Sequence, residues 1–219
     1  MKNYVIAISR QFGSGGKTIG ENLAKELGVN CYSREILRMA SDESGIKEEL
    51  FNANDEKISN GILTGISKNI YNGQLIPPGD RDFVSPENLF YYQAKIIKDL
   101  ASRESCVIVG RCADFVLKDY ENLISVFVHA PKEYCLARAA ERVALKGKEL
   151  EKFVAKTDKY RGAFYKYYTG REWEDARNYH LCLDSSQLGF EKTGEVIKAY
   201  MKIKLGELKP FDTSQNSGV

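Results

Sequence analysis

Residues 4–20 read Tyr-Val-Ile-Ala-Ile-Ser-Arg-Gln-Phe-Gly-Ser-Gly-Gly-Lys-Thr-Ile-Gly, and this segment is the strongest indication of the fold in the sequence. The apolar run Tyr4–Ile8 has the composition of a buried β-strand, and it enters a turn that is rich in glycine. Lys17 and Thr18 then open an amphipathic helix, which Gly28 ends. A strand, a glycine turn and a helix N-terminus in this order indicate a site for an anion.

The turn has the chemistry of a phosphate site. Glycines allow backbone N–H groups to point at a phosphate, and the helix dipole adds partial positive charge there. A neighbouring lysine can reach the terminal phosphates of a nucleotide, and a hydroxyl can bind Mg²⁺. We therefore expect ATP to bind at Gly13, Ser14, Gly15, Gly16, Lys17 and Thr18, with Thr18 as a Mg²⁺ ligand. The alternative is a turn that only connects a strand to a helix.

The position of the lysine within this loop has two interpretations. When the pattern G-x-x-x-x-G-K-[ST] ends at Gly16-Lys17-Thr18, its first glycine falls on Gln11. In a second register, with the form G-x-G-K-G-T, Gly16 and Lys17 stand where Lys-Gly would be. Backbone donors serve a phosphate in both registers, whereas the role of Lys17 differs between them.

Composition indicates a soluble globular protein. The 219 residues suffice for one substantial core, and 43% are hydrophobic while 28% are charged. No apolar run approaches the roughly 18 residues of a membrane span, and we expect no signal peptide. The five cysteines form no C-x-x-C pair, which favours reduced thiols in a cytoplasmic protein.

The charge is unevenly distributed. The net charge is only +2, but residues 132–177 carry twelve Lys/Arg against eight Asp/Glu. A local basic excess of this size suits a small anionic ligand better than a long polyanion. We expect small-molecule nucleotides as partners, with no nucleic acid and no membrane, and the sequence does not indicate an oligomeric state.

Short apolar runs alternate with helical patterns along the chain, which predicts an α/β fold with a mostly five-stranded parallel sheet and helices on both faces. The predicted strands are Tyr4–Ile8, Val29–Tyr32, Cys106–Gly110, Leu123–Ala130 and Tyr179–Asp184. The predicted helices are Lys17–Leu27, Pro86–Arg103, Lys132–Leu145, Leu150–Tyr168 and Glu191–Leu205. Ligands of such sheets bind at the carboxyl ends of the strands.

Arg111 follows the third predicted strand directly, after Gly110. This places a guanidinium at the carboxyl end of the sheet, where it can bind a phosphate with two hydrogen bonds. Asp114 is close enough to share that site. The alternative is a structural Arg–Asp pair at the edge of the sheet.

Cationic residues gather in the region after the fourth predicted strand. Arg138 and Arg142 are four residues apart, so one helix face would carry both, either around an anion or as an ordinary solvated face. The run that contains Lys156, Asp158 and Arg161 leads into several tyrosines. It can close over nucleotide phosphates, or Asp158 and Arg161 can form a simple intrahelical pair.

From Tyr4 to about Gly189 the chain resembles the cytidylate kinase-like branch of the P-loop nucleoside monophosphate kinases. The resemblance rests on the glycine loop, on Val-Ile-Val-Gly-Arg-Cys-Ala-Asp at residues 107–114, and on Asp158-Lys-Tyr-Arg161. A close variant of the family's Asp-Thr-Ser follows at residues 184–186. Asp114 stands two residues later than the family's aspartate, and Ser33 occupies a position where a carboxylate is usual.

The resemblance implies the three-layer fold of P-loop NTPases and transfer of the γ-phosphoryl group of Mg·ATP to a nucleoside monophosphate, with CMP or dCMP favoured. It implies that Lys17, Arg111 and Arg161 are catalytic and that Arg34, Arg111 and Asp114 bind the acceptor. A lid would hold Arg138, Arg142, Lys156, Asp158 and Arg161. Two alternatives remain: a nucleotide sensor without kinase turnover, and a small-molecule kinase with a non-nucleotide acceptor.

These implications predict a single kinase domain over residues 1–206, followed by a flexible tail at 207–219. Within the domain we expect an acceptor-binding insertion at about 33–104, whose part from 60 to 85 is mobile, and a helical lid at about 146–170. Residues 52–85 are where an acceptor base would be read.

Overall fold

The computed structural model describes residues 3–59 and 74–206 of the chain. The predicted tail at 207–219 lies outside these residues, as does the segment 60–73 of the predicted acceptor insertion. Within the described part, Pro77 to Phe83 form turns that lead into a long helix.

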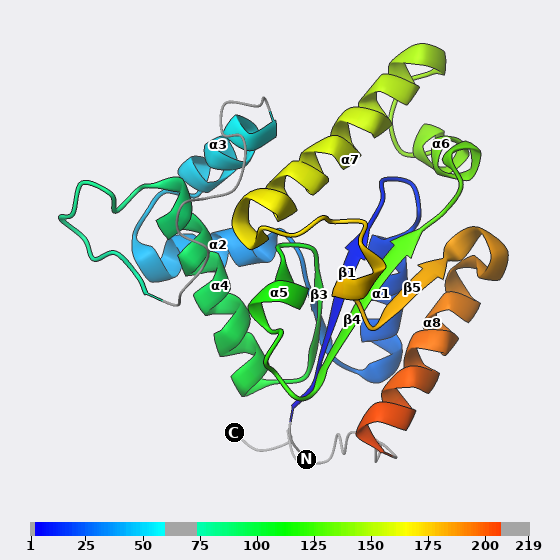
Figure 1. The fold of residues 1–219 in the computed structure, drawn as a ribbon, viewed down its shortest axis with the longest axis horizontal. Helices are drawn as coiled ribbons and strands as arrows, with labels where there is room; N and C mark the ends of the chain where they lie inside the picture. Colours follow the sequence, from blue (N-terminus) through cyan, green and yellow to red (C-terminus); the bar gives the residue numbers. More distant parts are fainter. Residues whose placement is uncertain (1–2, 60–73, 207–219) are drawn as a thin grey trace, which may run out of the picture.

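Five parallel strands form the predicted sheet. Their order across the sheet is β2-β3-β1-β4-β5, and every neighbouring pair is parallel. The strands are β1 (Val5–Arg10), β2 (Asn30–Tyr32), β3 (Cys106–Val109), β4 (Leu123–His129) and β5 (Leu181–Asp184). The first strand is therefore central, and the segment that follows it emerges in the middle of one edge of the sheet (Figure 1).

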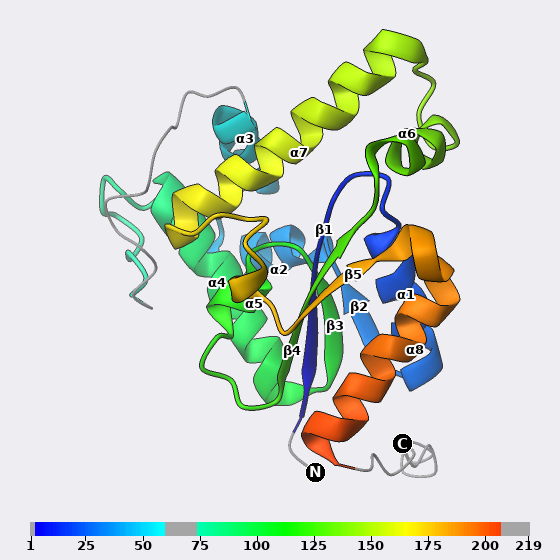
Figure 2. The ribbon, with the colours of Figure 1, turned by 45° about the vertical axis from the view of Figure 1, so that its right-hand side comes forward.

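Helices cover both faces of the sheet, so the fold is the predicted three-layer α/β sandwich (Figures 1 and 2). Side chains of β1 show the two faces, because Ile6 and Ile8 pack with α1 and α8, whereas Val5 and Ala7 pack with α2, α4 and α5. The helices are α1 (Gly16–Leu27), α2 (Glu35–Ser44), α3 (Glu48–Ser59), α4 (Pro86–Arg103), α5 (Ala113–Val116), α6 (Lys132–Ala140), α7 (Gly147–Thr169) and α8 (Ser185–Leu205), with a 3₁₀ turn at Ala176–Asn178.

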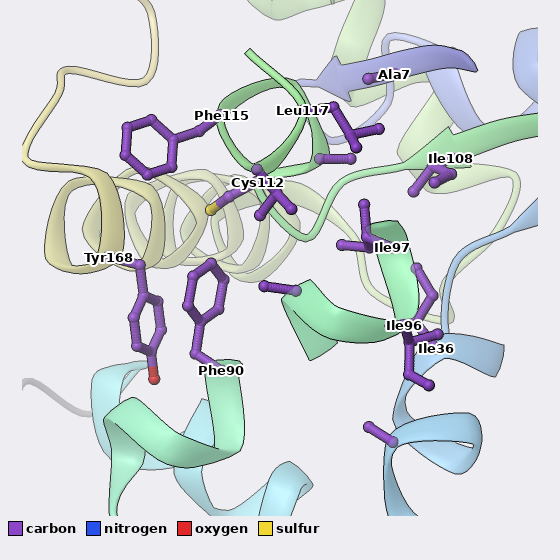
Figure 3. Packing of buried hydrophobic residues seen from close by; sticks show 14 of the residues in the cluster. Ala7, Ile36, Phe90, Ile96, Ile97, Ile108, Cys112, Phe115, Leu117 and Tyr168 are labelled. Atoms are coloured by element: carbon purple, nitrogen blue, oxygen red, sulfur yellow. The ribbon is translucent and has the colours of Figure 1, made fainter. Parts of the chain in front are cut away.

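The larger core cluster holds the predicted insertion and the predicted lid against the sheet. Phe90 of α4 stacks on Tyr168 of α7 with ring centroids 4.1 Å apart, and Cys112 and Phe115 lie nearby (Figure 3). Burial of several aromatic rings in one place contributes a large hydrophobic stabilisation. The C-terminal half of α7 is therefore fixed, and its N-terminal half extends beyond the sheet (Figure 2).

Three predicted helices differ from the observed ones by more than one residue at an end. The helix predicted for Leu150–Tyr168 begins three residues earlier, at Gly147. The helix predicted for Lys132–Leu145 ends at Ala140, since the chain turns there and Val143 and Leu145 pack against the cluster of Ala139, Leu150 and Val154. The last helix begins at Ser185, earlier than predicted, and has a kink at Gly189. The helices α2, α3 and α5 were not predicted.

Candidate functional site

The glycine loop joins β1 to α1 at the carboxyl edge of the sheet. Gly13 and Gly15 both have the left-handed backbone conformation, with φ of 86° and 81°. An added Cβ would lie 2.2 Å from the carbonyl oxygen of Cys135 at Gly13, and 2.1 Å from the ring of Phe190 at Gly15. The positive φ and the lack of space each exclude a side chain at Gly13 and Gly15. The backbone N–H groups at the start of α1 can therefore form an anion cradle.

A buried hydrogen bond fixes the shape of this loop. Ser14 is fully buried, and its carbonyl oxygen accepts a hydrogen bond of 2.7 Å from the hydroxyl of Ser185, at the start of α8. The Ser14 hydroxyl donates to the carbonyl of Gln11 at 2.9 Å. The loop is thus held by the start of α8, which lies on the same face of the sheet as α1.

Lys17 and Thr18 have partners other than an anion. The Nζ atom of Lys17 lies 3.4 Å from a carboxylate oxygen of Glu21, and the lysine side chain is 56% exposed. The hydroxyl of Thr18 accepts a hydrogen bond of 2.6 Å from the guanidinium of Arg142. A cation can bind at Thr18 only after Arg142 moves, so the assignment of Thr18 to Mg²⁺ remains a prediction.

A cavity of about 660 Å³ opens beside the loop, between the sheet edge, α2, α3 and α7. Four arginines line it, and three of them were singled out from the sequence: Arg34, Arg111 and Arg161. The fourth, Arg10, is the last residue of β1. The structure thus brings the predicted acceptor arginines and the predicted lid arginine to one place.

Arg111 lies on a tight turn after β3. Its φ is 58° and that of Cys112 is 53°, so two residues with side chains adopt the left-handed conformation in succession. Such backbone strain is retained where surrounding structure demands a particular side-chain direction. The guanidinium lies 5.9 Å from the ring centroid of Phe164 and donates to Gln93 at 3.4 Å.

Helix α7 contacts the glycine loop through Asp158 and Arg161. The Asp158 carboxylate accepts a hydrogen bond of 2.7 Å from the backbone N–H of Phe12 and lies 3.2 Å from Arg161. Arg161 also donates to the carbonyl oxygen of Arg10 at 2.9 Å. Burial raises the pKa of Asp158 and lowers that of Arg161, and their attraction opposes both shifts.

Asp114 does not line the cavity. Its carboxylate is buried and accepts a hydrogen bond of 2.6 Å from the hydroxyl of Tyr165, which does line it. Burial raises the pKa of Asp114 to about 6, although the Tyr165 hydrogen bond and the charge of Arg171 work against the shift. Asp114 therefore supports the cavity wall from behind, and its predicted contact with the acceptor remains untested.

The other predicted lid cations lie apart from the cavity. Arg142 follows the end of α6, so it does not share a helix face with Arg138 as predicted. Arg138 pairs with Glu141 at 2.9 Å and lies over the ring of Phe190, next to the glycine loop. Lys156 is exposed on α7. Arg138 and Arg142 can reach a nucleotide bound at the loop, whereas Lys156 requires a movement of α7.

Most of the remaining cavity wall was missed in the sequence, although Ser33 and the segment that begins at Asn52 had been noted. It combines aromatic rings with polar groups: Phe12, Phe153, Tyr160, Phe164, Ser33, Glu48 and Asn52. Such a wall fits a planar ligand with hydrogen-bonding edges. The rule that ligands bind at strand ends already pointed to the segment containing Arg10, but α2 and α3 carry no comparable sequence signal.

The described residues show few other functional features. Among them, no group of three or more His, Cys, Asp or Glu side chains could hold a metal ion. A search of the same residues for a helix long and apolar enough to cross a membrane found none. All five cysteines are free thiols.

In this parallel sheet of order β2-β3-β1-β4-β5, a glycine loop joins the central strand to the first helix. This arrangement is the fold of P-loop kinases. The chain belongs to the cytidylate kinase-like family, whose model matches residues 5–187. Membership indicates a phosphotransferase that binds a nucleotide. No curated protein matches the chain.

One solved structure agrees with this fold over most of its length. An uncharacterized protein from Eubacterium ventriosum is 26% identical, with a TM-score of 0.67 over 91% of this chain and 99% of that one. A gluconokinase from Sinorhizobium meliloti is 18% identical, with a TM-score of 0.48 over 93% and 95%. A shikimate kinase from Acinetobacter baumannii is 17% identical, with a TM-score of 0.44 over 94% and 96%. The last two scores are too low to carry an argument about function.

Proposed function

We propose that this protein transfers the γ-phosphoryl group of ATP to the phosphate of a nucleoside monophosphate, with CMP or dCMP as the favoured acceptor. The observation that carries the proposal is the meeting of Arg10, Arg111 and Arg161 in one cavity beside the glycine loop. Guanidinium groups this close repel one another, and a ligand with several negative charges relieves that repulsion. A phosphate acceptor supplies such charges, whereas a neutral sugar does not.

The chemistry needs positioning more than covalent help. An oxygen of the acceptor phosphate forms a bond to the γ-phosphorus, while the bond from that phosphorus to the β–γ bridging oxygen breaks. The electron pair of the broken bond leaves with ADP, the monophosphate becomes a diphosphate, and no proton has to move. Donors aimed at the moving group and exclusion of water therefore supply the catalysis.

The residues divide between donor and acceptor. The loop from Gly13 to Thr18 would bind the ATP phosphates, because its N–H groups lie at the start of α1. Arg111 would bind the acceptor phosphate, with Arg34 as a helper at the rim, and Arg161 would close the site from α7. Bound Mg²⁺ would neutralise charge on the β- and γ-phosphate oxygens.

The cavity wall supports a preference for cytosine. The aromatic side chains of Phe12, Tyr160 and Phe164 line the cavity, and Glu48 lies on the same wall. An ionised carboxylate only accepts hydrogen bonds, so it suits the amino group of cytosine better than the carbonyl oxygen of uracil. This argument predicts that CMP is preferred to UMP.

A nucleotide sensor is the second candidate, and two contacts favour it. Lys17 pairs with Glu21, and Arg142 holds the hydroxyl of Thr18, so neither side chain is directed to an ATP phosphate. A chain that kept these contacts after binding, with no other cation at the γ-phosphate, would hold a nucleotide without transferring its phosphoryl group.

The test is product formation from Mg·ATP with a panel of acceptors: CMP, dCMP, UMP, AMP, gluconate and shikimate. Chromatography should show CDP and dCDP forming fastest. Nucleotide binding in a thermal-shift assay with no diphosphate from any acceptor would favour the sensor. Product from a sugar acid alone would identify a non-nucleotide acceptor. Either result would contradict the proposal.

A further inference from the structure

The phosphate loop lacks a lysine that points at its own cradle. Gly16 is the first residue of α1, and Lys17, one position later, pairs with Glu21 on the outer face of the helix. Adjacent helical residues point about 100° apart, so a side chain at position 17 cannot take the direction of one at position 16. The charge that a phosphate loop places over the terminal phosphates must come from elsewhere in this chain.

The space above Gly16 is filled by Arg10. A Cβ added at Gly16 would lie 2.5 Å from Cβ of Arg10 and 3.0 Å from its Cγ. Contacts this short do not occur between real side chains, so only one of the two positions can carry a large side chain. In this chain that position is 10.

The sequence shows a matching exchange of residue types between positions 10 and 16. If the lysine of the pattern G-x-x-x-x-G-K stands at position 16, the second glycine is Gly15 and the first falls on position 10. The chain has arginine at position 10, where the pattern has glycine, and glycine at position 16, where it has lysine. The two departures from the pattern are neighbours in space and compensate each other.

The guanidinium of Arg10 extends from the loop toward the acceptor cavity. A Cβ added at Gly110, at the end of β3, would lie 2.6 Å from Nη1 of Arg10. Burial and the nearby charges of Arg161 and Arg111 lower the pKa of Arg10 to about 9, and Asp158 opposes this shift. The side chain of Arg10 thus begins at the glycine loop and ends beside Arg111 and Arg161.

We propose that Arg10 is a catalytic residue that replaces the lysine of a regular phosphate loop and binds the γ-phosphoryl group as it passes from ATP to the acceptor. This inference rests on the proposed function. Arginine suits the task because its rigid, planar fork of donors can bind oxygens of the donor and the acceptor in a fixed geometry, whereas an ammonium group is a compact charge on a flexible stem. Its stem lies against Gly16 and its guanidinium lies against Gly110, so the head is already in place before the reaction.

The first test compares single variants. Arg10→Met keeps a stem of similar length against Gly16 and removes the charge, and we expect kcat to fall about 100- to 1,000-fold. Lys17→Ala should lower kcat much less. A kcat of Arg10→Met within threefold of that of the unchanged chain would overturn the inference. A larger loss of kcat for Lys17→Ala than for Arg10→Met would do the same.

The second test exchanges the two positions. Arg10→Gly removes the charge, and Gly16→Lys alone meets the stem of Arg10, so each should have low activity. The double variant Arg10→Gly/Gly16→Lys restores the regular spacing, and we expect at least tenfold more transfer than for Arg10→Gly. A double variant no more active than Arg10→Gly would contradict the exchange.

A binding measurement separates this inference from the proposed function. If the unchanged chain forms no diphosphate, the proposed function fails. Calorimetry then compares ATP with ADP in the presence of Mg²⁺. Because only ATP has a γ-phosphate, Arg10→Met should weaken ATP binding at least tenfold more than ADP binding. Equal weakening of both nucleotides would overturn the role of Arg10.

Discussion

Single residues decide the charge balance of this site. Arg10, Arg111 and Arg161 bring three positive charges to one cavity, and Asp158 provides the negative charge that borders them. The glycines around them determine direction: Gly16 and Gly110 leave the space that Arg10 uses. Chemistry at this site therefore depends on where side chains are missing as much as on where they are present.

Asp114 should make stability depend on pH. Its pKa is raised to about 6 in the folded protein, mainly by burial, whereas it is 3.8 without the fold. The folded state thus binds more protons between these values, and the free energy of unfolding should fall by about 2 kcal/mol as pH rises from about 4 to 6. Urea denaturation across this range measures the change.

The matched variants for this measurement are Asp114→Asn and Asp119→Asn. The first carries no titrating group at the buried position and should flatten the pH dependence. The second changes an exposed carboxylate close by and serves as the control. A slope that Asp114→Asn leaves unaltered would show that Asp114 is not the group responsible.

At the level of elements, α7 is the part that connects donor and acceptor sides. Its C-terminal half is fixed in the aromatic core through Phe164 and Tyr168, while Asp158 and Arg161 reach the glycine loop. The N-terminal half of α7 also packs on α6 through Leu150 and Val154. A charged ligand that competes for the contacts of Asp158 and Arg161 would therefore move this half of α7 together with α6. This arrangement agrees with a lid, which remains a prediction.

Hydrogen exchange tests the lid. Amides across 150–168 should exchange more slowly when an ATP analogue and CMP are bound together than with either alone. Arg161→Ala should remove most of that protection and slow transfer, because Asp158 loses its partner. We expect little effect on CMP binding. Lys159→Ala, an exposed change on the same helix, is the control. Unchanged protection in Arg161→Ala would argue against a closing role for α7.

Sequence patterns predicted those elements that carry a strong local signal. Each strand was predicted within two residues of its observed ends, and Pro86–Arg103 was correct at both ends because Ser85 caps it and Pro86 opens it. The helices α2 and α3 were missed because they form only when Ile36, Leu37 and Phe51 bury themselves against α4. Such stabilisation comes from tertiary packing and leaves little trace in a local pattern.

The same distinction applies to the site. Glycines before a helix and an arginine at a strand end could be found from spacing, because the motif itself determines their position. Arg10 could not be recognised, since its role depends on the space left by Gly16 and Gly110, far apart in sequence. Arg142 was placed on the wrong surface because the chain turns after Ala140 to pack Val143 and Leu145.

On the scale of the whole molecule, the parallel sheet places the glycine loop and the turn that carries Arg111 side by side. The order β3-β1-β4 brings the turn after β3, which holds Arg111, next to the loop after β1. Helix α7 extends over the end of the sheet where these turns lie (Figure 2). We expect the glycine loop and the turn after β3 to form neighbouring sites with separate ligands. The donor nucleotide would bind at the loop and the acceptor in the cavity.

The most direct measurement of that claim is the pair of KM values for Arg111→Ala. Removal of a charged hydrogen-bond partner costs a few kcal/mol, so KM for CMP should rise at least tenfold. KM for ATP should stay within about twofold. Arg177→Ala, which removes an exposed arginine paired with Asp175, is the control and should change neither value. Equal increases in both KM values for Arg111→Ala would contradict separate donor and acceptor sites.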